Sequence, residues 1–372
     1  MRPPITAVPS DLEQIPDYPA VFLLWAPEGD PYLARTSLLR RRLRRLLASP
    51  DRLSRMLRLG GLVDRIEYWP TGSQLEAMLV HLELAQRHFP KEWPKITRLK
   101  PPAFVKLLGD NPFPRMMVTT RLGKGTALGP FPSRVAAERY ENQVLDLFQI
   151  RRCEENLVPS PEHPGCIYGE MNRCLRPCQQ VVSEDEYRHE SARVEAFLRS
   201  SGTSLLEPAE TARDRASSEM DFEEAERLHL RVERIKEAAN GAGELARPLD
   251  QLMGVAVVPS PGVNTINLVF FAAGRWQGVR SLFLGESSSV VLSMDRRLRE
   301  IAHEILPETG TAPKGPPITE HLAVLSRWHG ASWRDGEWIG FDSLEKIPYR
   351  KLVNAVGRVS AKRTGKASEQ PN

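Results

Sequence analysis

All cysteines of this chain lie in one short stretch. The chain has 372 residues and 4 cysteines, at Cys153, Cys166, Cys174 and Cys178, and glycine and proline bend the backbone between them. Thiolates gathered in this way are typical of a metal or an iron–sulfur site. Two disulfides, or four unrelated buried thiols, are the alternatives, but disulfides need an oxidising compartment and usually occur in small secreted folds. The length and the absence of a secretion signal favour a metal or cluster, and the spacing alone does not choose zinc over iron–sulfur.

Composition limits the remaining possibilities. The length predicts two or three domains, and a hydrophobic content of 41% is enough for ordinary cores. No apolar run is long enough to span a bilayer, so we expect no membrane partner and a cytoplasmic protein. The net charge is only +4, but positive charge is concentrated between positions 35 and 58, where Asp51 is the single acid. The arginines there are Arg35, Arg40, Arg41, Arg42, Arg44, Arg45, Arg52, Arg55 and Arg58.

Residues 1–98 have the pattern of a small α/β domain. Apolar β-prone runs at 20–25, 32–34 and 66–69 predict strands. Helices are expected from Ser37 to Leu47, over 51–59 and from Thr71 to Phe89. Residues 1–10 are expected to be an untethered lead. A helix rich in arginine is usually a solvated face, but so lopsided a charge favours a polyanionic partner.

This order of elements resembles the GIY-YIG nuclease domain of the UvrC family of excinucleases. Ala20-Val21-Phe22 stands where the family has Gly-Val-Tyr, and Tyr32-Leu33-Ala34 where it has Tyr-Val-Gly. The resemblance implies a catalytic Tyr32 and Arg42, with Arg35 in place of a lysine. It also implies DNA phosphate contacts from the neighbouring arginines Arg40, Arg41, Arg44 and Arg45. The alternative is a structural role, in which Tyr32 packs its ring against the core and keeps its hydroxyl at the surface.

The metal position of that family departs from its pattern. The family's metal-binding glutamate falls on His81, and its asparagine falls on Trp93. Magnesium prefers carboxylate oxygen to imidazole, and Glu76 and Glu83 lie roughly 140° and 160° around the helix from His81. We therefore expect cleavage to be lost or weakened, with Mg²⁺ needed only if the nuclease activity is retained.

Residues 99–152 and 153–180 extend the resemblance. The first segment is a β/α connector with Pro112-Phe113-Pro114-Arg115 and Gly129-Pro130-Phe131-Pro132-Ser133, in which Lys124–Gly129 is expected to turn and Ser133 to cap a helix. These motifs and the four-cysteine segment that follows are arranged as in the UvrC family. The resemblance implies a [4Fe–4S] cluster on the four cysteines, with zinc as the alternative.

Residues 181–240 predict a helical region. Ser183-Glu184-Asp185-Glu186 has the form of a capping box, and a helical hairpin follows with its turn near position 220. A plain surface hairpin is one interpretation. The stretch from Met220 to Ala225 also resembles the UVR motif, which implies contact with UvrB, another component of the same excinuclease, although His229-Leu230 replaces the family's Arg-Asp pair. The implied contact residues are Met220, Asp221, Phe222, Glu223, Ala225 and Leu228.

Residues 250–360 predict a C-terminal α+β domain, and residues 361–372 a disordered tail. Strands, helices and a basic helix over 348–359 alternate there. The fold class is thus α/β (α+β) and multidomain, with a small GIY-YIG-like mixed sheet. The expected function is that of a DNA-binding protein of nucleotide excision repair like those of the UvrC family. A non-catalytic repair adaptor and a metal-stabilised protein-interaction scaffold remain the alternatives.

Overall fold

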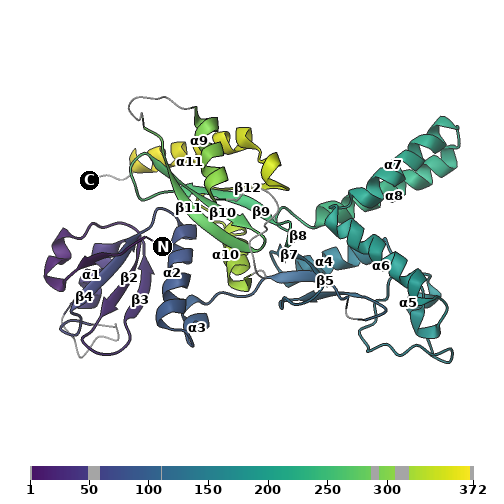
Figure 1. Ribbon diagram of the computed structural model, residues 1–372, viewed down its shortest axis with the longest axis horizontal. Coiled ribbons are helices and arrows are strands. Elements are labelled where there is room, and N and C mark those ends of the chain that lie inside the picture. Colours follow the sequence, from purple (N-terminus) through teal and green to yellow (C-terminus); the bar gives the residue numbers. More distant parts are fainter. Residues whose placement is uncertain (1, 49–58, 110, 286–292, 306–317, 369–372) are drawn as a thin grey trace.

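Three four-stranded antiparallel sheets with helices packed around them make up the described part of the chain, which confirms the α+β multidomain class (Figure 1). The computed structural model describes residues 2–48, 59–109, 111–285, 293–305 and 318–368. Within these ranges no helix is both long and apolar enough to cross a lipid bilayer.

The N-terminal sheet has the order β1-β4-β2-β3. Its strands are β1 (Ile5–Ala7), β2 (Ala20–Trp25), β3 (Tyr32–Thr36) and β4 (Arg65–Pro70). β1 corrects the expected untethered lead, because Ile5, Thr6 and Ala7 pair with β4 and Trp69 Nε1 donates to the Arg2 carbonyl at 2.9 Å. Three residues are too few to reveal a strand by periodicity, since their pairing depends on the edge that β4 offers.

Two helices cover opposite faces of this sheet. Helix α1 (Leu39–Leu47) buries Leu39, Leu43 and Leu46 against one face, after the 3₁₀ turn η1 (Pro9–Gln14). Ser37 does not cap it; Thr36 Oγ1 accepts from the Leu38 N–H at 3.1 Å instead. Helix α2 (Gln74–His88) covers the other face, capped by Ser73, and leads to the short α3 (Trp93–Thr97). The helix expected over 51–59 lies, apart from Leu59, outside the described residues.

The middle sheet has the order β6-β5-β7-β8. It comprises β5 (Ala103–Leu107), β6 (Met116–Thr119), β7 (Thr126–Phe131) and β8 (Arg247–Pro248). The turn expected at 124–129 is therefore largely a strand, because β7 continues through Gly129 and Pro130 between two partner strands. Helix α4 (Arg134–Leu145) begins at Ser133, whose side chain accepts from the Ala136 N–H as expected.

The cysteine segment and a long helical arm follow α4. The segment holds the four-residue α5 (Ile167–Glu170) and the turn η2 (Pro177–Gln179). Helix α6 (Glu184–Arg199) opens with the predicted capping box of Ser183 and Glu186. Helices α7 (Thr203–Ser218) and α8 (Phe222–Gly241) then form the predicted hairpin, which projects away from all three sheets (Figure 1).

The C-terminal sheet, of order β11-β10-β9-β12, is covered on both faces. Its strands are β9 (Met253–Pro259), β10 (Thr265–Ala272), β11 (Arg275–Phe283) and β12 (Glu337–Phe341). Helices α9 (Met294–Ile305) and α11 (Tyr349–Ser368) pack on one face, with η3 (Leu344–Lys346) before α11. Helix α10 (Thr319–His329) packs on the other face. Helix α11 continues past Ala361, where we expected the tail to begin.

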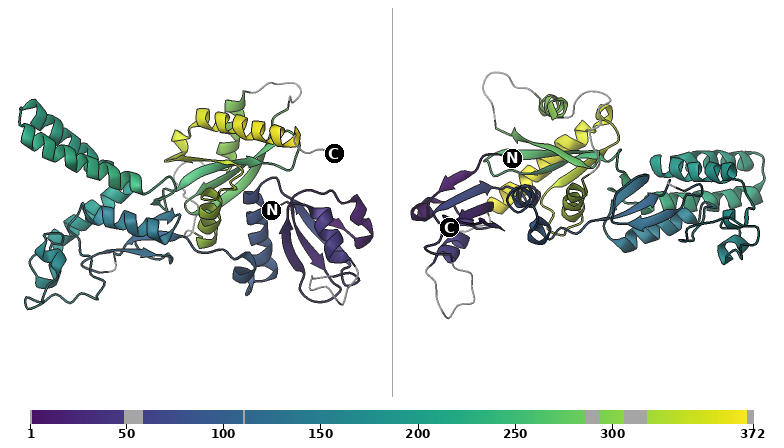
Figure 2. Two further views of the ribbon diagram at one scale, coloured as in Figure 1. Left: turned by 180° about the vertical axis from the view of Figure 1, so that it is seen from behind. Right: turned by 60° about the horizontal axis from the view of Figure 1, so that its bottom comes forward.

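Helix α2 belongs to two cores at once. Ala77 and Leu84 face the N-terminal sheet, whereas Leu75, Met78 and Leu82 pack with residues of the C-terminal sheet and α10. Both views in Figure 2 place α2 between the N-terminal sheet and the C-terminal domain. The N-terminal and C-terminal parts of the chain are thereby packed into one body, although more than a hundred residues separate them in sequence.

Candidate functional site

The tyrosine and arginine predicted from the GIY-YIG resemblance lie together. Arg42 Nη2 stands 3.5 Å from the Tyr32 hydroxyl, a long hydrogen bond between α1 and the start of β3. Tyr32 also packs on Phe22, with 6.3 Å between the ring centroids. Both side chains are half-buried on the face of the sheet that α1 covers. This pair can hold a phosphate between a phenol and a guanidinium.

Arg35 lies on the opposite face, because side chains alternate along a strand. Its neighbour Leu33 packs in the cluster under α2, and Arg35 follows the same alternation. The pKa of His81 on α2 is lowered to about 4, first by burial and then by the positive charge of Arg35. Burial and the charge of Arg327 on α10 lower the pKa of Arg35 in turn. The predicted catalytic residues thus form two groups on two sides of the sheet.

The nearby carboxylates have structural partners. Glu76 is 8% exposed, and its Oε2 accepts from the Gly72 N–H at 2.8 Å. Burial raises the pKa of Glu76 despite that hydrogen bond. Glu83 pairs with Arg87 at 3.0 Å. In the described ranges no three histidine, cysteine or carboxylate side chains are grouped as ligands of a single metal ion.

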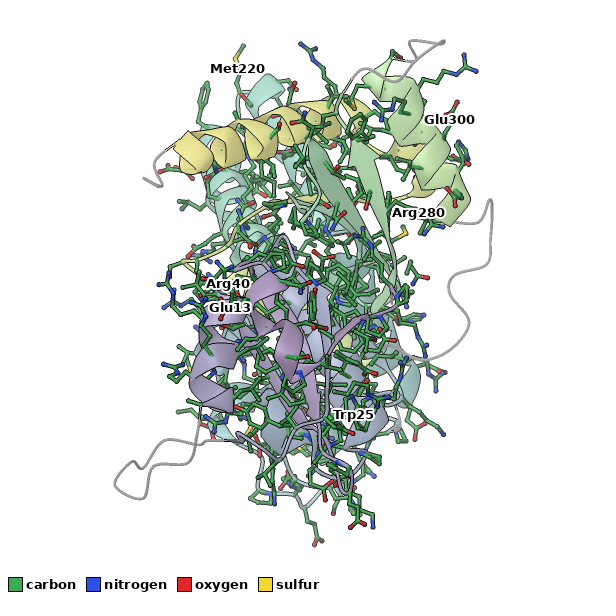
Figure 3. The ribbon with its side chains drawn as sticks, turned by 90° about the vertical axis from the view of Figure 1, so that its left-hand side faces the viewer. Glu13, Trp25, Arg40, Met220, Arg280 and Glu300 are labelled. Carbon is green, nitrogen blue, oxygen red and sulfur yellow. The ribbon has the colours of Figure 1, made fainter. Side chains whose placement is uncertain are left out.

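The arginines of α1 are partly neutralised by acids from η1 and the loop after it. Arg44 forms an ion pair with Glu13, and Arg40 donates to the Glu13 carbonyl at 3.3 Å. Figure 3 shows Arg40 and Glu13 side by side on the outer edge of the N-terminal domain. Arg41 lies 3.6 Å from Asp17. Glu13 and Asp17 precede the arginines that they contact by 24 residues or more, so the charge of the arginine-rich segment alone could not predict these contacts.

Arg42 and Arg45 are the exceptions on α1. Arg42 contacts the neutral Tyr32 hydroxyl, and Arg45 is exposed; neither has an ion-pair partner among the described residues. The structure describes the part of the predicted cation-rich surface that lies before residue 49. The other three arginines, Arg52, Arg55 and Arg58, lie outside the described residues. The described part of this surface retains a positive excess from Arg42 and Arg45.

The four cysteines line one small cavity. Cys153 follows α4, Cys166 is the N-cap of α5, Cys174 lies in the next loop, and Cys178 is in η2. All four are free thiols. The Leu175 N–H donates to the Gln149 carbonyl at 3.0 Å, which anchors the loop from outside. The Ser160 N–H donates to the Cys178 carbonyl at 2.9 Å, which links two parts of the loop itself. The fold therefore gathers around one space the thiols that the sequence spreads over two dozen positions.

Arg151 ties this cavity to the Pro-Phe-Pro motif. The side chain of Arg151 is buried; its Nε donates to the Phe113 carbonyl at 2.9 Å, and its Nη1 lies 3.7 Å from Cys153 Sγ. The backbone N–H of Arg151 donates to the Tyr187 hydroxyl at 2.8 Å, which in turn donates to the Pro114 carbonyl at 2.8 Å. The Pro-Phe-Pro-Arg motif was recognised in the sequence, but the sequence did not show that Arg151 and Tyr187 would donate hydrogen bonds to its carbonyl groups.

The surroundings of the cavity disfavour free thiolates, which a bound cation would stabilise. Burial raises the pKa of Cys174 to about 11, and the thiolate charges of Cys153, Cys166 and Cys178 contribute in the same direction. The Arg176 N–H lies 3.4 Å from Cys174 Sγ and acts against this rise. Without a cation the Cys174 thiol stays protonated near neutral pH, and a bound metal would release its proton. Four convergent thiols with two N–H donors therefore fit a thiolate-bound inorganic group.

The turn of the helical hairpin exposes large apolar side chains. Met220 is 76% exposed and Phe222 is 70% exposed, while Asp221 caps α8 by accepting from the Glu224 N–H. Glu223 is exposed and Ala225 half-buried. Leu228 is buried against α7. Of the predicted contact residues, the first four are thus available at the tip, and Leu228 supports the hairpin.

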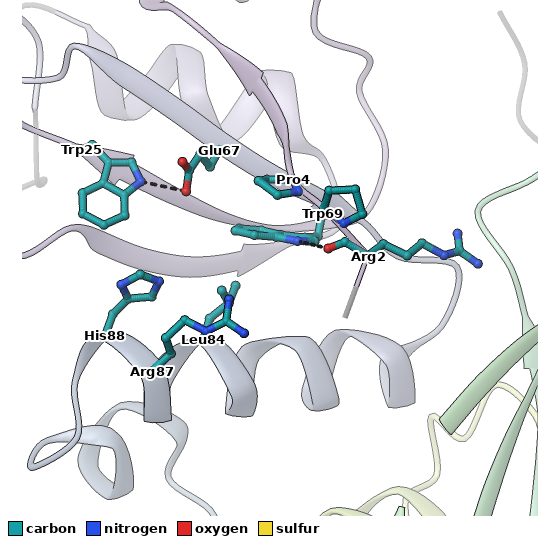
Figure 4. Close-up of a pocket in the computed structure, with 9 residues that line it drawn as sticks. Arg2, Pro4, Trp25, Glu67, Trp69, Leu84, Arg87 and His88 are labelled. Atoms are coloured by element: carbon teal, nitrogen blue, oxygen red, sulfur yellow. Dashed lines mark hydrogen bonds between the residues drawn. The ribbon is translucent and has the colours of Figure 1, made fainter. Parts of the chain in front are cut away.

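Two cavities beside α2 had no signal in the sequence. One, of about 480 Å³, lies between the sheet and the end of α2, with Trp25, Trp69, Arg87 and His88 in its wall (Figure 4). Trp25 Nε1 donates to Glu67 there at 3.0 Å. The other, of about 1310 Å³, lies where the N-terminal and C-terminal domains meet, and His321 and Trp276 line it. These residues are far apart in sequence, so no local motif marks them.

Comparison with known proteins agrees with this geometry. Residues 104–198 match the family described as UvrC/Cho excinuclease, middle domain. UvrABC system protein C of Dehalococcoides mccartyi is 25% identical over 363 residues, covering 95% of this chain and 58% of the relative. That of Acetivibrio thermocellus is 26% identical over 290 residues, covering 76% of this chain and 46% of the relative. No solved structure matches the chain.

The matched range contains the structural unit built around the cysteines. It begins in β5, includes the Pro-Phe-Pro motif, the four-thiol cavity and Arg151, and ends in α6. The chain spans about half the length of the curated relatives it matches. Residues 104–198 are thus similar to the UvrC/Cho excinuclease middle domain, and the chain that contains them is similar to UvrABC system protein C over most of its length.

Proposed function

We propose that this protein binds DNA phosphates and acts in nucleotide excision repair as a UvrC-like component. The observation that carries the proposal is the convergence of four thiols on one cavity inside the UvrC/Cho-type middle domain. The positive excess at Arg42 and Arg45 on α1 supports a DNA partner, because phosphate contacts of this kind need no base sequence. The relatives' name, UvrABC system protein C, supports the repair role.

We propose a [4Fe–4S] cluster as the group held by the four cysteines, with zinc as the alternative. Cys153, Cys166, Cys174 and Cys178 would hold it as thiolates. A zinc ion would need all four sulfurs about 2.3 Å away, whereas the cluster is the group that the resemblance to the UvrC family implies. When bound, it supplies a crosslink among four chain positions, and Arg151 then offsets part of its negative charge.

The helical hairpin is proposed to contact UvrB. Its exposed Met220 and Phe222 support this, because large apolar side chains at a projecting tip suit a protein interface. Cleavage at Tyr32 and Arg42 would need a divalent ion, since phosphodiester hydrolysis of this kind relies on a metal to polarise the phosphoryl oxygen. Tyr32 and Arg42 lie close enough to hold a phosphate between them, whereas Glu76 and Glu83, on α2, have other partners.

A non-catalytic adaptor of excision repair is the second candidate. It is favoured by the separation of Tyr32 and Arg42 from Arg35 and His81, which lie on the other face of the sheet. Such a protein would still use its arginines to hold phosphate. The two candidates differ only in whether a DNA strand is cut.

One experiment tests the proposal and separates these candidates. Protein purified without oxygen is mixed with lesion-bearing and plain duplexes, with and without Mg²⁺ and UvrB. We expect salt-dependent binding, iron and sulfide in the protein, and little or no incision. Efficient incision that Tyr32→Phe abolishes would overturn the adaptor. Stoichiometric zinc without iron would overturn the cluster, and the absence of any salt-sensitive binding would overturn the DNA role.

A further inference from the structure

Helix α11 contains six cations and no acid. Its cations are Arg350, Lys351, Arg358, Lys362, Arg363 and Lys366. The inner side packs on the C-terminal sheet through Leu352, Val356 and Val359. At 100° per residue, Lys351, Arg358 and Lys362 fall within about 40° of one another around the axis. All three are exposed, so they form a stripe parallel to the helix. Exposed Arg350 lies beside this row, about 100° from Lys351 around the axis, and we call the four residues together the α11 stripe.

The neighbouring helix α9 shows what a merely solvated charged helix looks like in this protein. Arg296 pairs with Glu300 at 3.2 Å, and Arg299 pairs with Asp295 at 2.7 Å. Arg280 on β11 pairs with Glu304 of α9 at 2.7 Å. Each of these α9 arginines has its acid one turn away, which is the ordinary way to keep a surface helix soluble. Helix α11 packs on the same face of the same sheet and lacks this arrangement.

One carboxylate faces the α11 stripe and does not neutralise it. Glu337 on β12 accepts from both Nε and Nη2 of Arg358, at 2.7 and 2.5 Å. Its hydrogen bonds with Arg358 first, and the positive charges of Lys362 and Arg334 after them, lower the pKa of Glu337. Arg350 and Lys351 have no ion-pair partner among the described residues. The stripe therefore keeps a surplus of positive charge after its single acid is counted.

The position of α11 relates this surplus to α1. In Figure 1 and in the reverse view of Figure 2, the carboxyl end of α11 points toward the end of the molecule that carries the N-terminal domain. Like charges held together on a rigid helix repel one another. Phosphates placed opposite them would relieve that repulsion, and the counterions released from the DNA would add a favourable entropy.

We propose that the α11 stripe is a second binding surface for the phosphate backbone of duplex DNA. It rests on the proposed DNA role and adds a contact from the C-terminal domain to that of α1.

The test is a salt titration of duplex binding by the full-length protein. The triple variant Arg350→Gln, Lys351→Gln, Lys362→Gln removes the cations of the stripe other than Arg358, which Glu337 already engages. Each lost phosphate contact lowers the slope of log affinity against log salt by about 0.9. We therefore expect a slope lower by about 2 to 3, with binding weakened equally for duplexes of different sequence.

Two further variants make the result decisive. Arg296→Gln, Arg299→Gln on α9 removes paired charge from the same domain and is expected to leave the slope unchanged. Arg350→Lys, Lys351→Arg, Lys362→Arg keeps the charge and should bind as the wild type does. If the triple glutamine variant matches the wild type while Arg45→Gln lowers the slope, α11 makes no contact and only this inference falls. If the wild type itself shows no salt-sensitive binding, the proposed function falls with it.

Discussion

Buried neutral histidines set the acid limit of this protein at the scale of single residues. The backbone N–H of Trp276 donates to His321 Nδ1 at 3.1 Å, so that nitrogen must be unprotonated. Burial first, and the charge of Arg275 second, lower the pKa of His321 to about 4 from the ordinary value of 6.5. His81 has the same depressed pKa from burial and Arg35. Both histidines lie on helices that join the N-terminal and C-terminal domains.

We predict that stability falls as the pH drops from about 6.5 to about 4. Between these values the unfolded chain binds protons that the folded chain excludes, so the folded state is fully favoured only above the unfolded pKa. For His321 the loss is on the order of 2 kcal/mol after allowance for its partial exposure. Urea midpoints measured across this range, beginning above neutral pH, should show it.

A matched variant isolates that histidine. His321→Asn keeps an oxygen that can accept from the Trp276 N–H but cannot gain a proton in this range, so its midpoint should vary less with pH than that of the wild type. His229, exposed on α8, serves as the control through His229→Asn, which should leave the pH profile unchanged. An identical profile for His321→Asn and the wild type would contradict the assignment.

At the scale of elements, the residues that stabilise the helical hairpin are different from those that are available to bind a partner. Its core consists of Leu228, Val232 and Ile235 on α8, whereas Phe222 is 70% exposed at the tip. We predict that Phe222→Ser leaves the melting temperature unchanged and weakens capture of UvrB by roughly tenfold or more, because apolar anchors dominate such interfaces. Thermal unfolding measures the first quantity, and calorimetric titration with UvrB measures the second.

The control for the hairpin is an exposed apolar residue far from it. Val263, in the loop between β9 and β10, is 79% exposed, and Val263→Ser should bind UvrB as the wild type does. If Phe222→Ser and the wild type bind alike, the tip is not the contact. If neither binds, UvrB is not the partner.

Local patterns predicted most elements well. The strand at 20–25, the cap at Ser133, the capping box at Ser183 and the helical hairpin with its turn near position 220 are all confirmed. Each depends on residues within one or two turns of one another, which periodicity and capping chemistry capture. β1 and β7 were missed because their strand character depends on partner strands elsewhere in the chain.

The candidate site was predictable where a motif is local and not where charges come from afar. Tyr32 and Arg42 do meet, and the four cysteines do line one cavity. The sequence could not show that strand alternation places Arg35 on the other face. It also could not show that Glu13 and Asp17 pair with the arginines of α1, because those contacts form only when η1 folds against that helix.

At the scale of the whole molecule, Gly72 sets how closely the N-terminal and C-terminal domains approach. A Cβ built on it would lie 2.2 Å from the Ser260 carbonyl carbon and 2.5 Å from the Pro259 oxygen, both backbone atoms. The contact continues at the start of α2, where the Gln74 N–H donates to Asp335 Oδ2 at 2.6 Å. No side chain can be added at position 72 unless the two domains shift apart.

We predict that Gly72→Ala loosens this junction. Overpacking of this kind costs about 1 to 3 kcal/mol, and the strain is relieved by separation of the domains. Small-angle scattering should show a larger radius of gyration, and limited proteolysis should cut sooner between residues 97 and 103. Gly278→Ala is the matched control, because nothing lies within 4 Å of an added Cβ there. Unchanged scattering for Gly72→Ala would contradict the prediction.

Because α2 packs against both the N-terminal and the C-terminal domain, neither domain is expected to be soluble when it is expressed alone. A fragment that ends near residue 98 would leave Leu75, Met78 and Leu82 bare to water, and a fragment that starts near residue 250 would lack the helix that shields its sheet. Both fragments would expose apolar surface and should aggregate. When the two fragments are expressed together, we expect them to associate and to form a soluble complex.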